Sequence, residues 1–341
     1  MTISERGRDR ILSGHVWIYR TDVTDASEAE PGAVVRLVDR RKQFWGQALY
    51  STKSQIALRL VTRASRPFDG AFLAERIARA VAYRERVAEG AQAYRVVAAE
   101  GDLLPSLIID RYGDCFVLQT LSQGTDRLKG DIVEILREQF APLSVLERND
   151  AAVRALEGLP EQKGVLFGES VSEVVIEDHG MKFCYDLAGG QKTGGFLDQR
   201  ENRTAAKKYA RGRLLDCFCY TGAFAVALAR QCDSVLGVEI SAEALALARR
   251  NQELNGLTNV EWKEANGFDF LTQSGGHTCP WLQKGGEPLR KDFPWAVPVH
   301  TEELAHVQDQ PDLTTPTCHI SSLSGIVAVN ARRLTLTDWA S

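Results

Sequence analysis

Three apolar runs of the sequence are each ended or followed by residues that could bind a ligand: Asp216, Gly222, Glu239 and Asn266. If these runs are strands of an open α/β sheet, the four residues lie at the carboxyl ends of the strands, where ligands bind in such sheets. Glu239 comes 23 residues after Asp216. A carboxylate there can accept the protons of both ribose hydroxyls of a nucleoside, and Asn266 would bind the amino edge of adenine. Asp216 alone is better interpreted as a helix cap, but the ordered set predicts nucleoside binding.

The turn after Asp216 distinguishes two nucleoside-containing cofactors. A nicotinamide dinucleotide needs a glycine-rich G-x-G-x-x-G turn, because backbone must approach its pyrophosphate. In this turn Phe218 and Tyr220 precede the single glycine, Gly222. S-adenosylmethionine has no phosphate, so it is compatible with bulkier residues. The turn favours S-adenosylmethionine, and a nicotinamide dehydrogenase is the disfavoured alternative.

The elements that would position these residues alternate between strand and helix. We expect strands at 214–216, 235–239 and 260–263, and helices at 223–230 and 242–254. This alternation is typical of a doubly wound parallel sheet. After about residue 272 the pattern ends, and six of the eleven prolines and four of the six histidines lie in the last 69 residues.

Two further regions precede this sheet. Residues 1–65 contain β-rich runs at 34–38, 44–50 and 56–61 separated by turns, which predict a small β-barrel. Residues 69–186 predict an α+β domain, with helices at 71–88 and 128–140 and strands at 94–99, 107–110 and 115–120. A hairpin is expected from strands 171–176 and 181–186 around Asp178-His179-Gly180.

The composition is that of a soluble globular protein, with 44% hydrophobic and 25% charged residues and a net charge of −4. No apolar run is long enough for a membrane span, and the charged start is unlike a secretory signal, so we expect a cytoplasmic protein. Seven cysteines without a C-x-x-C pair predict reduced thiols and no metal site. Residues 1–63 carry eleven Lys or Arg against seven Asp or Glu, an excess that can attract phosphate.

Several strings resemble one protein family. The run from Gly194 to Arg203 (GGFLDQRENR) and the run from Leu215 to Phe224 (LDCFCYTGAF) resemble bacterial class I methyltransferases that make 5-methylcytosine in large-subunit rRNA. Gly14–Tyr19 is similar to the start of the family's PUA RNA-binding domain. Strings at 100–105, 110–113 and 177–180 are similar to its central domain, so the resemblance covers about residues 5–271.

The resemblance implies a fold, a cofactor and a partner. It implies a PUA-like barrel at 1–65, an α+β domain at 69–186 and a class I methyltransferase (Rossmann-like) α/β domain at 187–341 that is atypical after 272. It implies rRNA as partner and S-adenosylmethionine as cofactor, with a homodimer among the oligomeric states left open. The loop Lys192–Arg200 would line the cofactor pocket, and the implied cofactor-binding residues are Phe196, Asp198, Arg200, Asp216, Tyr220, Thr221, Gly222, Glu239 and Asn266.

Individual roles follow from that set. Phe196 would pack on an apolar part of the cofactor, and Arg200 would pair with its methionine carboxylate, a surface salt bridge being the alternative. His15 and Trp17 would touch RNA, although a Trp in the barrel core is an equal interpretation.

The chain departs from the family after residue 272. Family members have a D-P-P-x-F string and a later S-C-S type string that carries a cysteine nucleophile, but this sequence has no Pro-Pro pair. Cys279 and Cys318 lie in other contexts, and Cys217 and Cys219 lie on the cofactor turn. Methylation of cytosine carbon 5 needs a thiolate, so the catalytic residues stay unassigned. The rival hypothesis is an inactive RNA-binding protein that keeps part of the cofactor pocket.

Overall fold

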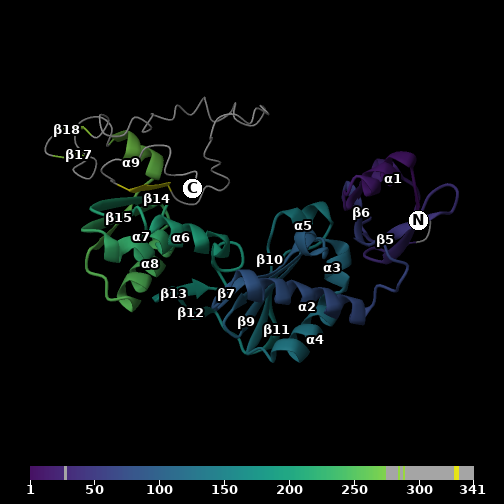
Figure 1. The fold of residues 1–341 in the computed structure, drawn as a ribbon, viewed down its shortest axis with the longest axis horizontal. Helices are drawn as coiled ribbons and strands as arrows, with labels where there is room; N and C mark the ends of the chain where they lie inside the picture. Colours follow the sequence, from purple (N-terminus) through teal and green to yellow (C-terminus); the bar gives the residue numbers. More distant parts are fainter. Residues whose placement is uncertain (27–28, 274–282, 285–286, 289–325, 330–341) are drawn as a thin grey trace. The chain divides into compact units, whose positions relative to one another are not determined.

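The computed structural model describes residues 1–26, 29–273, 283–284, 287–288 and 326–329. The chain forms two compact units, residues 1–200 and 201–341, which are described separately (Figure 1). No helix in the described ranges combines the length and the apolar character that a membrane crossing requires.

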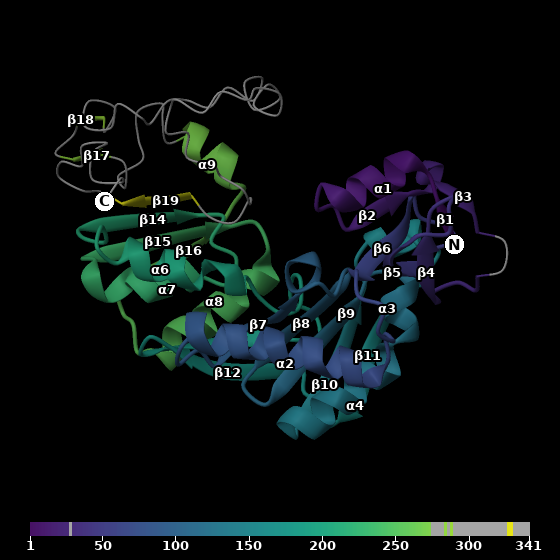
Figure 2. The same ribbon diagram turned by 45° about the vertical axis from the view of Figure 1, so that its right-hand side comes forward.

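The first unit begins with a six-stranded sheet, ordered β2-β6-β5-β4-β1-β3 (Figure 2). Its strands are β1 (Thr2–Ile3), β2 (Trp17–Tyr19), β3 (Val23–Asp25), β4 (Val34–Val38), β5 (Phe44–Tyr50) and β6 (Ile56–Thr62). The three strands predicted in this region are confirmed as β4, β5 and β6. Ile18 of β2, Leu37 of β4 and Leu58 of β6 are fully buried and belong to one core cluster.

A helix in this region was missed. The run predicted as strands and turns contains α1 (Glu5–Leu12) and a short 3-10 helix, η1 (Arg20–Asp22). Ser4 caps α1 by accepting a hydrogen bond from the backbone N–H of Gly7 at 3.1 Å. Only Gly7 and Ile11 of α1 are buried. The buried face is therefore too narrow to give a clear helical period in the sequence.

The second sheet of this unit has the order β11-β10-β9-β8-β7. Its elements are α2 (Gly70–Val87), β7 (Ala93–Ala98), η2 (Ala99–Asp102), β8 (Leu107–Tyr112), β9 (Cys115–Thr120), α3 (Gln123–Arg127), α4 (Lys129–Phe140), β10 (Ser144–Asn149), α5 (Val153–Leu156) and β11 (Gln162–Gly168). The predicted strands and both predicted helices are confirmed, but β10 and β11 were missed. β9 and β10 run parallel and are joined through α3 and α4.

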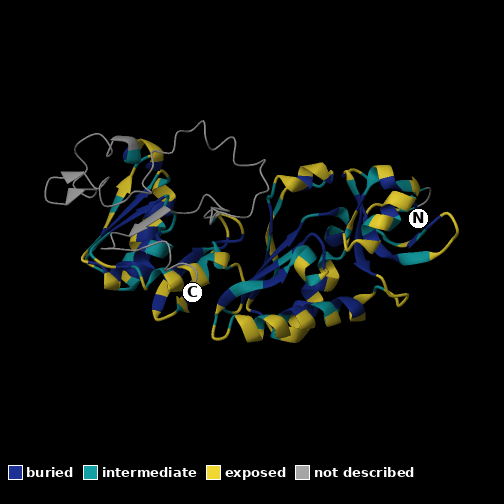
Figure 3. Ribbon diagram, turned by 45° about the horizontal axis from the view of Figure 1, so that its top comes forward, coloured by how far each residue is buried: buried dark blue, intermediate teal, exposed yellow. Residues whose placement is uncertain are grey.

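Buried residues of this sheet and its two long helices form one core, which Figure 3 shows as dark blue. Ile77 of α2, Leu118 of β9 and Leu136 of α4 are fully buried in it. The predicted hairpin is confirmed as β12 (Glu173–Asp178) and β13 (Met181–Asp186), paired in register from Glu173↔Asp186 to Asp178↔Met181. A further 3-10 helix, η3 (Leu197–Gln199), follows it.

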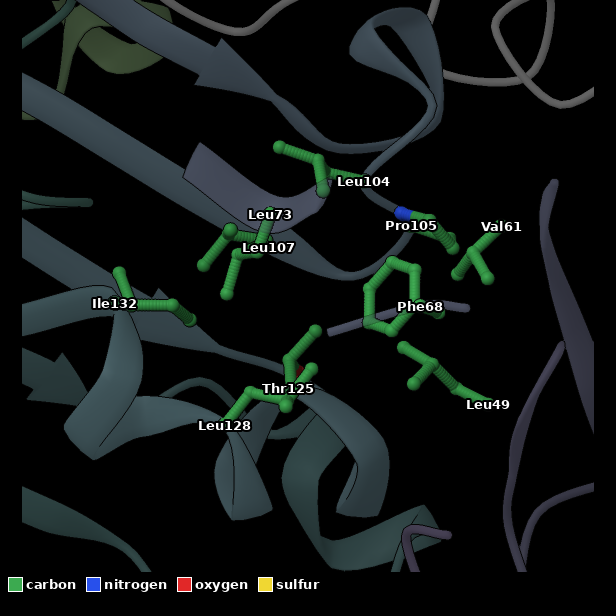
Figure 4. Close-up of a pocket in the computed structure, with 10 residues that line it drawn as sticks. All are labelled: Leu49, Val61, Phe68, Leu73, Leu104, Pro105, Leu107, Thr125, Leu128 and Ile132. Atoms are coloured by element: carbon green, nitrogen blue, oxygen red, sulfur yellow. The ribbon is translucent and has the colours of Figure 1, made fainter. Parts of the chain in front are cut away.

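The two sheets of the first unit are joined by buried contacts. Arg59 of β6 and Glu157 form an ion pair at 2.7 Å, with only 6% and 1% of their side chains exposed. A small apolar pocket beside this junction is shown in Figure 4. It is lined by Leu49, Val61, Phe68, Leu73, Leu104, Pro105, Leu107, Thr125, Leu128 and Ile132.

The second unit contains a sheet ordered β16-β15-β14-β19. Its elements are α6 (Arg200–Ala206), β14 (Arg213–Cys217), α7 (Ala223–Leu228), η4 (Ala229–Gln231), β15 (Ser234–Glu239), α8 (Ala242–Leu254), β16 (Val260–Glu264), α9 (Gly267–Gln273), β17 (Gln283–Lys284), β18 (Glu287–Pro288) and β19 (Ile326–Val329). β14, β15 and β16 are parallel, which confirms the predicted sheet. β19 pairs with β14 in the antiparallel sense, so the late part of the chain adds a strand that the sequence did not predict.

Candidate functional site

Asp216 lies at the carboxyl end of β14 and is 1% exposed. Its Oδ2 accepts a hydrogen bond from the backbone N–H of Ala225 in α7 at 3.0 Å, so it does cap a helix. Its Oδ1 is also buried but has no hydrogen-bond partner among the residues that the structure describes. Burial raises the pKa of Asp216 to about 7, and the nearby charge of Glu239 adds to the rise although the Ala225 N–H opposes it. One oxygen is thus structural, and the other is available.

Glu239 ends β15 and is half-buried. Its Oε1 accepts hydrogen bonds from the backbone N–H groups of Ile240 (2.9 Å) and Ser241 (3.1 Å). Its Oε2 accepts one from the N–H of Tyr220 at 2.9 Å, which joins β15 to the turn after β14. Three fixed donors hold the carboxylate in one orientation while leaving acceptor capacity on Oε2.

The turn between β14 and α7 has an unusual backbone. Phe218 (φ 60°), Tyr220 (φ 50°) and Gly222 (φ 71°) are all in the left-handed region, which costs energy for the two aromatic residues. Gly222 lies close to a neighbouring side chain. A Cβ at this position would lie 2.3 Å from the Trp262 ring, so the group that needs the space is a side chain of β16. The backbone carbonyl of Thr221 accepts a hydrogen bond from Asn251 at 3.0 Å.

Asn266 follows β16 and is exposed. Its Oδ1 accepts hydrogen bonds from the backbone N–H groups of Phe268 (2.9 Å) and Asp269 (3.4 Å), so it caps α9. The Phe268 ring lies 4.8 Å from that of Phe218, which brings the turn after β14 beside the start of α9. The ends of β14, β15 and β16 therefore meet at one edge of the sheet, as predicted.

The two cysteines of the turn are poor nucleophiles. Cys217 and Cys219 are free thiols and are buried, with exposures of 1% and 6%. Burial raises the pKa of the Cys219 thiol, and the carboxylates of Asp216 and Glu239 raise it further. Because the thiolate is the reactive form, this thiol is inert at neutral pH. Cys279 and Cys318 lie outside the described residues.

Phe196, Asp198 and Arg200 belong to the first unit, on the loop from Lys192 to Arg200. Lys192 interacts with two residues of this loop: its Nζ lies 3.4 Å from Asp198 and 4.3 Å from the centre of the Phe196 ring. Arg200 Nε donates to Asp178 Oδ1 at 2.9 Å, and both side chains are largely buried. The alternative for Arg200 was a surface salt bridge; Arg200 does form an ion pair, but the pair is largely buried.

The anchor of this loop was missed from the sequence. Thr193 is fully buried, and its hydroxyl donates to Asp110 Oδ2 at 2.6 Å. The Tyr112 hydroxyl lies 3.2 Å from the same Thr193 oxygen. Arg95 also binds Asp110, donating from Nε to Oδ1 (2.8 Å) and from Nη2 to Oδ2 (3.0 Å). The sequence does not distinguish Thr193 from any other loop threonine, because its partners Asp110 and Tyr112 lie on β8, about 80 residues earlier in the chain.

The two residues expected to touch RNA are at the surface. His15 is exposed, and Trp17 is 39% exposed, so Trp17 is not a core residue of the barrel. The Trp17 indole N–H donates to Glu100 at 3.0 Å.

Comparison with protein families gives two matches. Residues 1–63 match PUA-like domains, and residues 160–273 match S-adenosylmethionine-dependent methyltransferases. S-adenosylmethionine is therefore the cofactor of this type of protein.

Curated relatives match over most of the chain. The ribosomal RNA large subunit methyltransferase I of Tolumonas auensis is 40% identical over 273 residues, covering 77% of this chain and 69% of the relative. The protein of the same name from Klebsiella pneumoniae (strain 342) is 40% identical over 260 residues, covering 74% and 65%. The chain thus spans about two thirds of the length of these relatives.

Solved structures show the same fold. A methyltransferase from Streptococcus mutans aligns with a TM-score of 0.67 at 21% identity, covering 80% of this chain and 72% of that one. A methyltransferase in complex with S-adenosylhomocysteine aligns with a TM-score of 0.69 at 21% identity and the same coverage. Because the curated relatives are about 40% identical over most of the chain, we conclude that the chain belongs to the family of S-adenosylmethionine-dependent methyltransferases that includes the ribosomal RNA large subunit methyltransferase I proteins.

Proposed function

We propose that residues 1–271 are the RNA-binding and cofactor-binding parts of an S-adenosylmethionine-dependent methyltransferase that acts on carbon 5 of a cytosine in large-subunit rRNA. The observation that carries the proposal is the pair of carboxylates at the sheet edge, Asp216 and Glu239. They lie in a chain whose relatives are rRNA methyltransferases. Within this proposal, the barrel (1–65) contacts RNA, and residues from 187 onward bind the cofactor.

The residues present fit the cofactor. S-adenosylmethionine has hydroxyl, amino and ammonium groups that donate hydrogen bonds, and this edge of the sheet offers acceptors. The buried Oδ1 of Asp216 lacks a partner in the described part of the chain, and Oε2 of Glu239 has capacity for another donor. We assign the ribose to Glu239 and an acceptor nitrogen of adenine to the amide NH2 of Asn266, since Oδ1 of Asn266 already accepts from Phe268 and Asp269. By the family resemblance, Phe196, Asp198, Arg200, Tyr220, Thr221 and Gly222 complete the site.

Arg200 has a more limited role in this proposal than the sequence suggested. Its Nε donates to Asp178, so that nitrogen does not serve a ligand carboxylate. The turn at Phe218 and Tyr220 excludes the glycine-rich phosphate loop of a nicotinamide-binding protein, since both positions carry large side chains.

When bound, the cofactor supplies an electrophilic methyl group. Carbon 5 of cytosine becomes nucleophilic only after a thiolate adds to the neighbouring ring carbon. The raised pKa of Cys219 and the burial of Cys217 remove both thiols of the turn from this role. The described residues therefore supply binding, and we assign no described side chain as nucleophile.

Calorimetry on the full chain tests the cofactor part of the proposal. Titration with S-adenosylhomocysteine should give saturable binding, whereas NAD at the same concentrations should give none. Tighter binding of NAD would overturn the interpretation of the turn. Filter binding with an unmodified large-subunit rRNA transcript tests the RNA part, and failure to bind it at low salt would refute that part alone.

A further inference from the structure

The loop that joins β4 to β5 carries three cationic residues in succession, Arg40, Arg41 and Lys42. All three side chains are exposed. Within the described ranges, none of them has an acidic side chain at ion-pair distance. A fourth exposed cation, Arg36, lies on β4, where its guanidinium sits 4.5 Å from the centre of the Phe44 ring.

No ion pair joins the carboxylate closest in sequence, Asp39, to these three side chains, although the charge of Arg41 acts on it. Asp39 is 9% exposed, and its Oδ1 accepts hydrogen bonds from the backbone N–H groups of Arg41 (2.8 Å) and Gln43 (2.9 Å). Its Oδ2 accepts one from the Trp45 indole at 3.2 Å. Asp39 therefore fixes the loop through two backbone groups and the Trp45 indole, while the side chains of Arg40, Arg41 and Lys42 are exposed.

Other carboxylates of the barrel are also engaged. Asp22 lies 3.0 Å from Arg10, and Asp9 lies 2.9 Å from Arg8. Glu30 pairs with Arg127 of α3. Three exposed cations of residues 1–63 that form no ion pair with a described carboxylate thus follow one another on a single loop, whose backbone Asp39 holds through hydrogen bonds.

We propose that the β4–β5 loop, Arg40 to Lys42 with Arg36 beside it, binds the phosphate backbone of RNA. This inference rests on the proposed function and adds to it the place where the barrel holds RNA. A fixed loop presents its charges without first losing backbone entropy, and exposed cations release counterions when they neutralise phosphates. Such contacts set affinity and position, and they carry no sequence information.

The test compares charge-removing and charge-keeping variants of the full chain. In the first, Arg40→Gln, Arg41→Gln and Lys42→Asn are combined; Asn suits position 42 because Lys42 has a φ of 62°. The second combines Arg40→Lys, Arg41→Lys and Lys42→Arg. A control, Arg79→Gln, Arg86→Gln and Lys208→Gln, removes three exposed cations outside the barrel.

The measurement is the affinity for an unmodified large-subunit rRNA transcript across a salt series. Three lost phosphate contacts should lower the slope of log affinity against log salt by roughly 2 to 3, and the affinity by about 100-fold at 0.1 M salt. The charge-keeping variant and the control should keep the slope of the unsubstituted chain. Melting curves of all variants should coincide, since every substituted side chain is exposed.

Three outcomes would overturn the inference. If the charge-removing variant binds as tightly as the unsubstituted chain, the loop is not the site, although the proposed function stands. If the control loses as much affinity, the effect belongs to net charge and not to the loop. If the unsubstituted chain does not bind the transcript, both the inference and the RNA part of the proposed function are wrong.

Discussion

The hydroxyl of Thr193 donates to the Asp110 carboxylate at 2.6 Å, across 83 residues of sequence and without exposure to solvent. Because that single proton goes to Asp110, the Tyr112 hydroxyl, 3.2 Å away, must be the donor to Thr193. Burial and the charge of Asp110 raise the pKa of Tyr112, so its hydroxyl stays protonated. The loop that carries Phe196, Asp198 and Arg200 is thus tied to β8 by a chain of hydrogen bonds.

Replacing Thr193 with Val should loosen this loop. The change keeps the shape but leaves Tyr112 and Asp110 each short of one partner, at a cost of about 1–3 kcal/mol. Hydrogen exchange of residues 189–200 should accelerate accordingly. Thr193→Ser keeps the hydroxyl and should exchange almost like the unsubstituted chain; equal acceleration in both variants would show that packing, and not the hydrogen bond, holds the loop.

The Glu239 carboxylate should be needed for cofactor affinity. Glu239→Ala removes the proposed ribose contact and should weaken S-adenosylhomocysteine binding by about 1–3 kcal/mol, roughly 5- to 150-fold, in calorimetry. Glu243→Ala, which changes an exposed carboxylate at the start of α8, is the matched control. Unchanged affinity in Glu239→Ala would remove Glu239 from the site.

Asp216 should make the second unit less stable as the pH rises. Its pKa is raised to about 7 in the folded chain, so between the ordinary value of 3.8 and 7 the folded state binds more protons than the unfolded state. The stabilising contribution of Asp216 is therefore largest below about pH 4 and is lost through this window, by at most about 4 kcal/mol. Hydrogen exchange of β14, corrected for intrinsic rates, should report this slope. The slope should vanish in Asp216→Asn and persist in Asp233→Asn, whose carboxylate is exposed; a slope that persists in Asp216→Asn would contradict the assignment.

The buried pair Arg59–Glu157 should be costly to break. Arg59→Met leaves Glu157 buried with an unpaired charge, which should destabilise the first unit by about 3–5 kcal/mol. Arg137→Met breaks the exposed pair with Glu134, whose side chains are 43% and 61% exposed, and should cost less than about 1 kcal/mol. Chemical denaturation, monitored through the hydrogen exchange of β6 and β9, measures the change in the free energy of unfolding for both variants. If Arg59→Met and Arg137→Met destabilise the chain equally, the buried ion pair contributes no more to stability than the exposed one.

The chain as printed should bind its ligands without making 5-methylcytosine. It has no D-P-P-x-F string, and the described thiols of the turn are buried. Incubation with labelled S-adenosylmethionine and unmodified rRNA should therefore give no product. Grafting a family-type C-terminal half after Leu271 should restore it. Product from the unsubstituted chain would contradict the prediction, and Cys279→Ala and Cys318→Ala would then show which thiol acts.

The sequence by itself determined the helices and strands whose apolar residues form a clear pattern, together with the residues near their ends. The strand before Asp216, the strand before Glu239 and helix 242–254 lie where the pattern placed them, because apolar runs bounded by turn residues leave little choice. The PUA-like and methyltransferase matches were likewise indicated by local strings.

Only the tertiary structure decided what each polar side chain does. Sequence spacing cannot say that Trp262 fills the space above Gly222, that Asp178 takes Arg200, or that Asp39 turns inward and leaves Arg40 to Lys42 exposed. Helix α1 was missed for the same reason. Only two of its residues are buried, and the sequence alone does not show that they share a buried face. A hydrogen bond depends on distances of a few tenths of an ångström between residues far apart in sequence, and folding alone sets those distances.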